Sequence, residues 1–507
     1  MKSVFPCRDT FKNKAKLGNL VPVWCEIDTH HKTPVTAYES VRSYLRNKNN
    51  VSHSYLLESA EGGEHIGRYS YIGGSPRAIL RGYGNTIEIE RGDNKEIIKC
   101  TNLLDALKQE MNKYTPVKDE NLESRFIGGA VGFFGYDVVS QFEPRIPIME
   151  NDDLMSPDMV YMITDGLIIF DNIKNKLVLL THAHIEDNTD LAYDKALEYL
   201  IDLENALNSS FNSLIIESPP DLKILDASSN TTKEEYFEMV EKAKEYIQSG
   251  DIIQVVLSQR FEVNNQADSL DIYKSLRLIN PSPYMFCLDM GDSSIIGTSP
   301  EIHVRCQNQQ VEVRPIAGTR PRGNTKHQDE ELEKELLNDP KECAEHIMLV
   351  DLGRNDIGRV CDFSSIQIPD FMIVERYSHV MHIVSNVVGT LNKDNDIYDV
   401  MSVTFPAGTV SGAPKIRAME IIAELEKSKR GPYAGAVGYF GFDGNFDSAI
   451  TIRTVILDKD KAYIQAGAGI VADSIAENEY NETKNKALGM IKALSLAKYY
   501  NELKGDG

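Results

Sequence analysis

A nine-residue segment that occurs twice in the chain places the strongest constraint on its fold. GAVGFFGYD at 129–137 returns as GAVGYFGFD at 435–443, and seven of the nine residues are identical. Each copy is followed by an apolar stretch with a polar turn, LIIFDNIKNKLVLL or TVILDKDKAYIQA, which is typical of a β-hairpin. A spacing of about 300 residues is too long for a solenoid repeat, so we infer two duplicated halves. Chance similarity between two glycine-rich strands is the alternative.

The remaining patterns alternate strands with long helices. Thr231-x-x-Glu234 predicts a capping box at the start of a helix that Gly250 ends, with Tyr236 and Val240 on one face. A strand pattern, GDIIQVVLSQRFEV, follows this helix. We therefore predict an α+β protein with antiparallel sheets rather than a parallel Rossmann-type arrangement.

A polar stretch with two prolines, ESPPDLKILDASSN, precedes the same helix and marks the main boundary. We predict an N-terminal domain at 1–225 and a C-terminal domain at 226–507. The two are expected to be intertwined.

Charge and composition exclude several classes of protein. The 507 residues include 54 Lys and Arg against 76 Asp and Glu, a net charge of −22, which repels nucleic acid and anionic membrane surfaces. No apolar run approaches the roughly 18 residues of a membrane span, and the first residues lack a signal-peptide pattern. We therefore expect a cytoplasmic protein that binds neither nucleic acid nor membrane. The seven scattered cysteines lack C-x-x-C spacing and are expected to be reduced thiols.

Two predicted helices each carry a Glu-x-x-Glu pair. Glu342 and Glu345 fall on one face of a helix that should begin near Pro340, and Glu479 and Glu482 repeat the pattern late in the chain. Either pair alone is most simply a solvated helix face. If the pairs faced each other across a cleft, the carboxylates would repel unless a cation lay between them. Mg²⁺ takes oxygen ligands and keeps positions open for substrate.

Other segments are candidates for binding an anion or moving a proton. Gly467-Ala468-Gly469 and Gly318-Thr319 would let backbone N–H groups approach an anion, although such segments are more often turns. His382 lies in an apolar segment and is either a core histidine or an acid–base group. The glycine-rich stretch FPAGTVSGAPKIRAME should be a loop that opens a helix near Pro414. Four cationic residues could pair with carboxylates, unless they are ordinary surface residues: Arg320, Arg322, Arg453 and Lys486.

Taken in order, these segments resemble the chorismate-utilising enzymes, and most closely the component I (synthase subunit) family of anthranilate synthases. The matching motifs are PIAGTRPRG, EHIMLVDLGRNDIGRV, RYSHVMHIVS, FPAGTVSGAPKIRAMEII, GAVGYFGF, IRT, QAGAGIVADS and ENEYNETKNKA. The match is dense over about 231–496 and thin in the N-terminal third, where LLESA and GGAVGFFGYD carry it. The resemblance implies two large antiparallel sheets packed face to face and flanked by helices, with the active site between them.

The resemblance also assigns a metal and substrate site in the C-terminal domain. Glu345 and Glu482 would ligate Mg²⁺, supported by Glu342 and Glu479, and the metal would hold the ring carboxylate of chorismate. The rest of the substrate, mainly its carboxylates, would be bound by Gly318, Thr319, Tyr433, Arg453, Gly467, Ala468, Gly469 and Lys486.

Three residues receive catalytic roles from the same resemblance. Glu301, in TSPE, matches the general acid for departure of the C4 hydroxyl, His382 would assist proton movements around the ring, and Thr409 would lie against the substrate. In the family's chemistry, ammonia adds at C2 while the C4 hydroxyl leaves as water, which gives 2-amino-2-deoxyisochorismate. Loss of pyruvate then gives anthranilate, in the first step of tryptophan biosynthesis. Hydroxide is a poor leaving group, so an acid must protonate it.

Two positions separate related activities within the family. Isochorismate and salicylate synthases carry a water-activating lysine where this chain has Gln254. Aminodeoxychorismate synthases often have lysine where this chain has Ala317, in PIAGT. Direct attack of ammonia at C2 fits these two residues best.

A feedback site for L-tryptophan is also implied, with the N-terminal domain contributing to it. LLESA and NPSPYMF carry the resemblance, although NPSPY could be only a proline-fixed turn. The implied contact residues are Glu58, Ser59, Asn280, Pro283, Tyr284, Met285, Gly297 and Tyr439.

The chain contains no glutaminase signature of the G-x-C-x-G type. We therefore expect ammonia to come from a separate glutaminase subunit in a hetero-oligomer. Three alternatives stay open: an aminodeoxychorismate synthase component I, a non-catalytic tryptophan-sensing subunit, and a structural protein that binds divalent cations. The second would be marked by loss of Glu345, Glu482 or His382, and all three are present.

Overall fold

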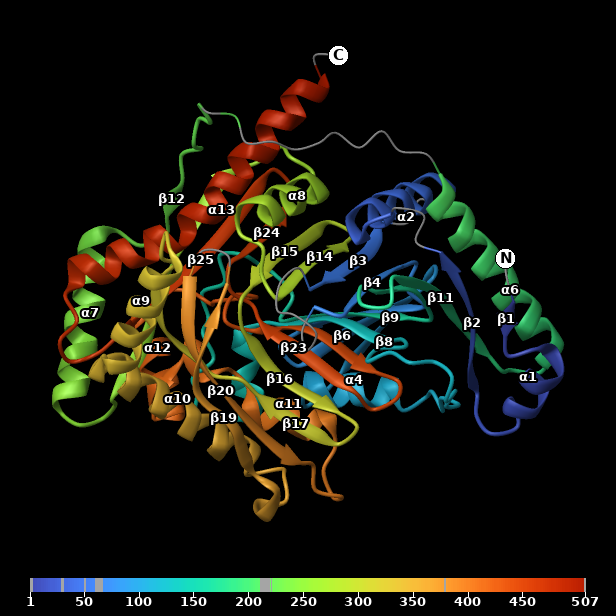
Figure 1. Cartoon of the computed structure of the whole chain (residues 1–507), viewed down its shortest axis with the longest axis horizontal. Coiled ribbons are helices and arrows are strands. Elements are labelled where there is room, and N and C mark those ends of the chain that lie inside the picture. The colour runs from blue at the N-terminus through green and yellow to red at the C-terminus, as the bar shows by residue number, and fades with distance from the viewer. Residues whose placement is uncertain are drawn as a thin grey trace.

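The computed structural model describes residues 3–28, 32–49, 52–59, 67–209, 219, 221–377 and 380–505. Within them the strands form two antiparallel sheets, as predicted (Figure 1). The first sheet, in spatial order, contains β1 (Val4–Phe5), β2 (Leu20–Asp28), β11 (Lys176–His184), β10 (Gly166–Asp171), β4 (Tyr69–Gly74), β3 (His53–Glu58), β14 (Tyr284–Met290), β15 (Ser293–Ser299), β24 (Thr454–Asp458), β25 (Lys461–Ile470), β13 (Gln254–Asn264) and β12 (Ser228–Ser229), with β21 (Gly412–Ala413) beside β13.

The second sheet packs against one face of the first. Its order is β18 (Ile316–Pro321), β20 (Val380–Thr390), β17 (Gln310–Val313), β16 (Ile302–Gln307), β23 (Phe446–Ile450), β22 (Ala436–Gly441), β8 (Gly129–Phe134), β9 (Met159–Thr164), β5 (Ala78–Tyr83), β6 (Thr86–Arg91) and β7 (Asn94–Lys99), with β19 (Gln367–Arg376) beside β20.

Helices cover the outer faces of both sheets (Figure 1). They are α1 (Arg8–Lys14), α2 (Pro34–Asn49), α4 (Leu103–Met111), α5 (Val139–Phe142), α6 (Thr189–Asn208), α7 (Lys233–Gln248), α8 (Ser269–Ile279), α9 (Lys326–Asn338), α10 (Pro340–Ile357), α11 (Ile397–Thr404), α12 (Lys415–Leu425) and α13 (Ala476–Gly505), with 3₁₀ turns η1 (Tyr136–Val138), η2 (Phe363–Ser365) and η3 (Gly408–Val410).

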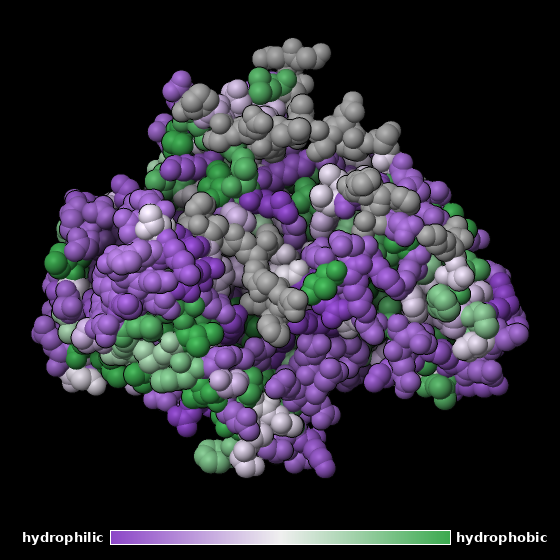
Figure 2. All heavy atoms as spheres, viewed as in Figure 1, coloured by the Kyte–Doolittle hydropathy of each residue, from purple (hydrophilic) through white to green (hydrophobic). Residues whose placement is uncertain are grey.

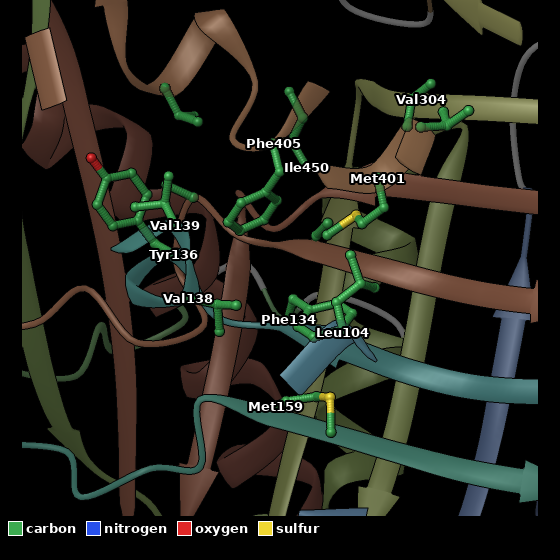
Figure 3. Packing of buried hydrophobic residues seen from close by; sticks show 14 of the residues in the cluster. Leu104, Phe134, Tyr136, Val138, Val139, Met159, Val304, Met401, Phe405 and Ile450 are labelled. Atoms are coloured by element: carbon green, nitrogen blue, oxygen red, sulfur yellow. The ribbon is translucent and has the colours of Figure 1, made fainter. Parts of the chain in front are cut away.

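The alternation of side chains along each strand builds three apolar layers. In β8, Val131 and Phe133 point between the sheets, whereas Ala130 and Phe134 point outward toward helices. Leu167 of β10, in the facing sheet, belongs to the same buried cluster as Val131 and Phe133. Figure 3 shows the outer layer, where Phe134 lies among Leu104, Met159 and Met401. Period-two alternation thus gives each sheet two buried faces.

The repeated segment forms the two central strands of the second sheet. β8 and β22 pair antiparallel with Gly132 opposite Gly438. A Cβ atom at Gly132 would lie 1.9 Å from the carbonyl oxygen of Val160, and one at Gly438 would lie 2.1 Å from that of Asp447. Both copies keep glycine here because the neighbouring strand approaches too closely for a side chain.

Both sheets are arranged symmetrically about this centre. Outward from β3 and β14, the first sheet continues through β4, β10, β11 and β2 on one side and β15, β24, β25 and β13 on the other. Outward from β8 and β22, the second continues through β9, β5, β6 and β7, and through β23, β16, β17 and β20. Both predicted hairpins, β10–β11 and β24–β25, are present. This order is what two duplicated halves produce, and it favours duplication over chance similarity.

The predicted capping box of α7 is one residue out of place. The N-cap is Thr232, whose hydroxyl accepts from the N–H of Glu235, and the Glu235 carboxylate accepts from the N–H of Thr232 at 2.9 Å. Thr231 is buried, and its hydroxyl donates to Asn230 Oδ1 at 3.1 Å. Thr231 cannot cap the helix because its side chain is already used. The division at 225 and 226 stays a prediction, and residues 210–218 and 220 lie outside the described part of the chain.

Surface and composition agree with the sequence patterns. Hydrophilic residues cover most of the face seen in Figure 2, with separate apolar patches. In the described part of the chain, no helix has the length and apolar character needed to cross a bilayer. The seven cysteines are free thiols, and four of them are buried: Cys25, Cys287, Cys306 and Cys361.

Candidate active site

A cavity of about 700 Å³ opens where the first sheet splits. β24 and β25 pair only as far as Val455 and Ile464, so the rest of β25 runs free of its neighbour on that side. The cavity lies among β13, β18, β25, α10 and α13. Of the predicted metal, substrate and catalytic residues, fourteen line it: Glu301, Gly318, Thr319, Glu342, Glu345, His382, Thr409, Tyr433, Arg453, Gly467, Gly469, Glu479, Glu482 and Lys486.

Ala468 is the exception among these predictions. It is fully buried, and its side chain points away from the cavity into the apolar layer under the helices. Successive residues of a strand face opposite sides, so Gly467 and Gly469 line the cavity while Ala468 cannot contribute a side chain to it. Gln254 and Ala317, the two positions that separate related activities, also line the cavity.

The first Glu-x-x-Glu pair lies on the opening turns of α10. Asp339 caps this helix by accepting from the N–H groups of Lys341 at 3.0 Å and Glu342 at 3.3 Å, and Pro340 fills the first turn. Glu345 follows one turn later on the same face. Its Oε1 accepts from Gln254 Nε2 at 3.1 Å, so β13 meets α10 directly at the carboxylate.

The second pair lies near the start of α13. Glu482 forms an ion pair with Lys486 at 2.6 Å, and Lys486 also donates to the carbonyl oxygen of Gly467 at 2.9 Å. Burial raises the pKa of Glu479, and the charge of Glu482 adds to the effect. Burial likewise raises the pKa of Glu342, with the charge of Glu345 adding. Each pair is therefore close enough for one carboxylate to disfavour the charge on Glu342 or Glu479.

This donor set fits a magnesium ion. Within the described residues, no three His, Cys, Asp or Glu side chains gather into a complete metal cage. Mg²⁺ is ordinarily held by only one or two carboxylates, with water and substrate oxygens in the other positions. Glu345 and Glu482, on two helices that border one cavity, would supply oxygen ligands of this kind.

Glu301 is placed to act as an acid. It follows β15, and its Oε1 accepts a hydrogen bond of 2.7 Å from the Thr409 hydroxyl. Burial raises the pKa of Glu301 to about 8, which the Thr409 hydrogen bond partly opposes. At neutral pH this carboxyl group is therefore mostly protonated and carries a proton it can donate.

His382 lies on β20, and one nitrogen of its ring is held by a backbone carbonyl oxygen. Its Nδ1 lies 3.0 Å from the carbonyl oxygen of Gly318, and burial lowers the pKa of the ring. A carbonyl oxygen can only accept, so we assign the proton to Nδ1 and a free lone pair to Nε2. Gly318 has φ +66°, at a bulge that a side chain would strain. The cavity wall thus holds a neutral histidine able to accept a proton.

Cationic and glycine residues on the other wall form a place for carboxylates. Arg453 is largely buried, and burial lowers its pKa while the nearby charge of Glu482 raises it. A Cβ atom at Gly467 would lie 2.7 Å from Tyr433 Oη, and one at Gly469 would lie 2.5 Å from Gln254 Nε2. Glycine at these two positions therefore makes room for the Tyr433 hydroxyl and the Gln254 amide at the cavity wall.

A second, smaller cavity of about 70 Å³ lies between the sheets at the centre of the molecule. Six of the eight predicted inhibitor residues line it: Glu58, Ser59, Pro283, Tyr284, Met285 and Tyr439. Asn280 instead lines the larger cavity, and Gly297 faces the Phe286 ring, whose Cζ would lie 2.1 Å from a Cβ atom there. Gly297 thus makes room for Phe286.

Several residues of this second cavity were missed by the sequence analysis. Tyr71, Arg305 and Asp447 line it, and Arg305 pairs with Asp447 at 2.9 Å. They belong to β4, β16 and β23, which are distant in sequence, so no local sequence pattern predicts that they meet. Pro283 lines both cavities, which makes the 280–285 segment their shared wall.

The N-terminal half carries different residues at the positions that correspond to the wall of the larger cavity. Counted from each hairpin turn, Gly467 and Gly469 of β25 correspond to His182 and His184 of β11. His182 is buried, and His184 Nε2 lies 2.8 Å from Asp165 Oδ1. Imidazole rings therefore stand where the C-terminal half has glycines.

The turn that carries Glu301 has a counterpart as well. GTSPE at 297–301 matches GGSPR at 73–77, so Arg77 stands in place of the acid. Arg77 Nε donates to Asp165 Oδ2 at 2.6 Å. An ion pair between Arg77 and Asp165 thus stands at the position that corresponds to Glu301.

Fold and site together define an enzyme that acts on a small polyanionic substrate. The family model described as "chorismate binding enzyme" matches residues 52–492, and the chain belongs to this family of chorismate-utilising enzymes. It is 46% identical over 499 residues to an anthranilate synthase component 1 from Acetivibrio thermocellus, covering 97% of this chain and 99% of that protein.

Solved structures agree. An anthranilate synthase component I from Streptococcus pneumoniae TIGR4 superposes with a TM-score of 0.74 at 38% identity, covering 85% of this chain and 95% of that one. A menaquinone-specific isochorismate synthase from Escherichia coli gives a TM-score of 0.70 at 17% identity, over 96% and 99% of the two chains, and shares the fold. The predicted fold class and family are confirmed.

Proposed function

We propose that this chain is the synthase subunit of an anthranilate synthase, which converts chorismate and ammonia into anthranilate and pyruvate with Mg²⁺. The relatives named anthranilate synthase component 1 support it, since they match nearly the full chain. The observation that carries it is the single cavity in which the predicted acid, the carboxylate pairs and the cationic residues meet, with Gln254 and Ala317 among them. The activity would be the first step of tryptophan biosynthesis.

Glu345 and Glu482 would hold the metal, with Glu342 and Glu479 behind them. When bound, Mg²⁺ would supply Lewis-acid stabilisation of charge on the ring carboxylate and a template for its orientation. Gln254 orients one ligand by donating to Glu345 Oε1. Lys486 neutralises part of the charge on Glu482.

The substrate's carboxylates require positive partners inside a strongly negative protein. Arg453 and Lys486 provide charge, and Tyr433 provides a hydroxyl beside Gly467. These groups lie on one side of the cavity. Thr409 belongs to a different element, η3, and Glu301 belongs to the turn between β15 and β16. Chorismate held by its carboxylates would thus present its ring hydroxyl to an acid.

Glu301 would donate its proton to the C4 hydroxyl, which leaves as water while ammonia forms its bond at C2. The ammonium nitrogen then releases one proton, which balances the one used. In the second step, His382 Nε2 would accept the proton from C2 as the ring becomes aromatic. The enolpyruvyl group departs and, after taking up one proton, is released as pyruvate.

Gln254 and Ala317 support ammonia as the nucleophile. An amide at 254 cannot deprotonate water as an amine base could. Alanine at 317 offers no amine for covalent attack on the ring. Exclusion of solvent from the occupied cavity would then limit competition by water.

A partner and an inhibitor complete the proposal. The name component 1, carried by the relatives, implies a partner component for those proteins. For this chain we propose a separate glutaminase subunit that supplies ammonia, in a hetero-oligomer. The cavity between the sheets, with buried Glu58 and the rings of Tyr71 and Tyr439, would bind L-tryptophan as feedback inhibitor.

Product analysis tests the proposal. The purified chain is incubated with chorismate, Mg²⁺ and ammonium chloride, and separately with glutamine, and products are identified by mass. We expect anthranilate with ammonium and none with glutamine alone. A 4-amino-4-deoxychorismate product would instead identify an aminodeoxychorismate synthase, and glutamine-dependent turnover would contradict the need for a partner.

A further inference from the structure

Arg430 is a completely buried cation behind the active-site wall, and four of its N–H groups are bonded. Two go to the carboxylate of Glu426, at 2.8 and 2.6 Å. One goes to the carbonyl oxygen of Val410 at 2.8 Å and one to that of Val256 at 2.7 Å. Only 1% of its side chain is exposed. Such a fork fixes the relative positions of everything it touches.

Both backbone segments that accept from Arg430 border the active-site cavity. Val256 lines it from β13, and Val410 lines it from η3. Val410 directly follows Thr409, whose hydroxyl holds Glu301 Oε1. By holding the Val410 carbonyl oxygen, the guanidinium group of Arg430 therefore fixes the position of the neighbouring Thr409 and of its hydrogen bond to Glu301.

The flat faces of Arg430 are also used. Its Cζ lies 4.6 Å from the ring centre of Tyr136 and 5.6 Å from that of Tyr433. Tyr433 borders the active-site cavity, and Tyr136 lies on the far side (Figure 3 shows its ring beside Val139). Cation–π contacts to both rings hold Tyr433 against the substrate side.

Glu426 extends the same network to β13 and β25. Its Oε1 accepts from the N–H of Ser258 at 2.8 Å and from the Ser258 hydroxyl at 2.9 Å. That hydroxyl in turn accepts from Gln465 Nε2 at 2.9 Å, and Gln465 lines the cavity. Four separate parts of the cavity wall are thus tied to one buried ion pair.

A buried ion pair is a costly way to obtain stability alone. An apolar pair of similar volume often stabilises a fold as well or better. Here the charges bring backbone carbonyls, an N–H group and two rings to one point, which an apolar pair could not do.

We propose that Arg430, with Glu426, is a positioning residue of the active site: it places Thr409, and through it Glu301, together with Tyr433. The proposal rests on the proposed function only for the identity of the product. Loss of chorismate is measured alongside, so a different product would overturn the proposed function without affecting this test.

A cavity of about 300 Å³ on the far side of Arg430 makes a chemical-rescue experiment possible. It is bordered by Arg430, Glu426, Lys429, Tyr136 and Asp137. In Arg430→Ala, millimolar guanidinium could enter the vacated space from this side. We expect kcat to fall roughly 100-fold, the size of effect that a misplacement of about 1 Å can produce. Guanidinium should recover an order of magnitude of this loss, whereas methylammonium, which lacks the fork, should not.

A double variant, Arg430→Met/Glu426→Gln, separates positioning from stability. The amide introduced by Glu426→Gln would keep an acceptor for Ser258, and no unpaired charge is left buried. We expect the thermal unfolding of the double variant to stay close to wild type while kcat stays low. Arg417→Ala, which removes a partly exposed arginine paired with Asp251 at 2.7 Å, is the control and should keep full activity without response to guanidinium. Near-wild-type kcat in the double variant, or guanidinium that fails to raise kcat in Arg430→Ala, would overturn the proposal.

Discussion

The hydroxyl of Thr409 donates a hydrogen bond of 2.7 Å to Oε1 of Glu301, and this contact joins η3 to the buried carboxyl group. The two residues are 108 positions apart in sequence. One comes from a 3₁₀ turn after α11, the other from the turn between β15 and β16. Burial of this carboxyl group raises its pKa to about 8, although hydrogen bonds from the Thr409 hydroxyl and the Ile316 backbone oppose the shift.

Replacement of the acid should abolish most turnover. Glu301→Gln keeps the oxygen that accepts from Thr409 but has no acidic proton. General acid catalysis typically contributes 10²–10⁴-fold, so we expect kcat to fall by roughly that factor with little change in chorismate KM. Steady-state kinetics measure both quantities. A kcat within a small factor of wild type would show that another group protonates the hydroxyl.

The pH dependence should report the same carboxyl group. Burial raises the pKa of Glu301 to about 8. The acid works only when protonated, so kcat should hold below that pH and fall as pH rises through about 8. In Thr409→Val the group loses the hydrogen bond that lowers its pKa, so this limb should move to higher pH. If the fall of kcat occurs at the same pH in Thr409→Val as in wild type, it does not report the titration of Glu301.

His382 should matter through Nε2 rather than through its contact with Gly318. His382→Asn keeps an amide N–H that can reach the Gly318 carbonyl oxygen but removes the base. We expect kcat to fall roughly 10²-fold, the lower range for acid–base groups. Thermal unfolding of the variant should match wild type. Unchanged kcat would make His382 the core histidine that the sequence left open as the alternative.

The predicted inhibitor cavity can be tested without touching the active site. Ser59→Phe or Met285→Thr should weaken inhibition by tryptophan by an order of magnitude or more and leave kcat intact, because both line only the smaller cavity. Met290→Thr is the control: Met290 is buried near the other end of β14 and lies outside that cavity. If the inhibition constant for tryptophan is the same in Ser59→Phe and Met285→Thr as in the Met290→Thr control, tryptophan binds elsewhere.

Much of the fold could be predicted because the repeated segment is constrained by its own packing. Gly132 and Gly438 allow the adjacent strands to approach, and that need keeps both copies similar. Hairpin turns and period-two patterns are local, so β10–β11 and β24–β25 follow from sequence. The cap of α7 was misplaced because its choice between Thr231 and Thr232 depends on burial, which the local pattern does not contain.

The candidate site was predictable where motifs carried it and not where distant elements meet. Ala468 was predicted together with its glycine neighbours as a segment whose backbone N–H groups approach an anion, and that role stays a prediction, although strand alternation turns its side chain away from the cavity. Arg430 went unnoticed because its partners Val256, Val410 and Tyr136 come from distant segments, and only Glu426, four residues earlier, is local. No spacing in the sequence marks such a meeting point.

The most direct test of the account is the Mg²⁺ dependence of anthranilate formation in Glu345→Gln and Glu482→Gln. Each substitution keeps the size of the side chain and removes the charge that a hard cation requires. Glu477→Gln, on the same helix as Glu482 but paired with Lys233 at 2.6 Å on an exposed face, is the matched control. We predict that the first two variants fold normally, lose turnover and no longer respond to Mg²⁺, while the control behaves as wild type. Near-normal, Mg²⁺-dependent turnover in either Glu345→Gln or Glu482→Gln would contradict the account.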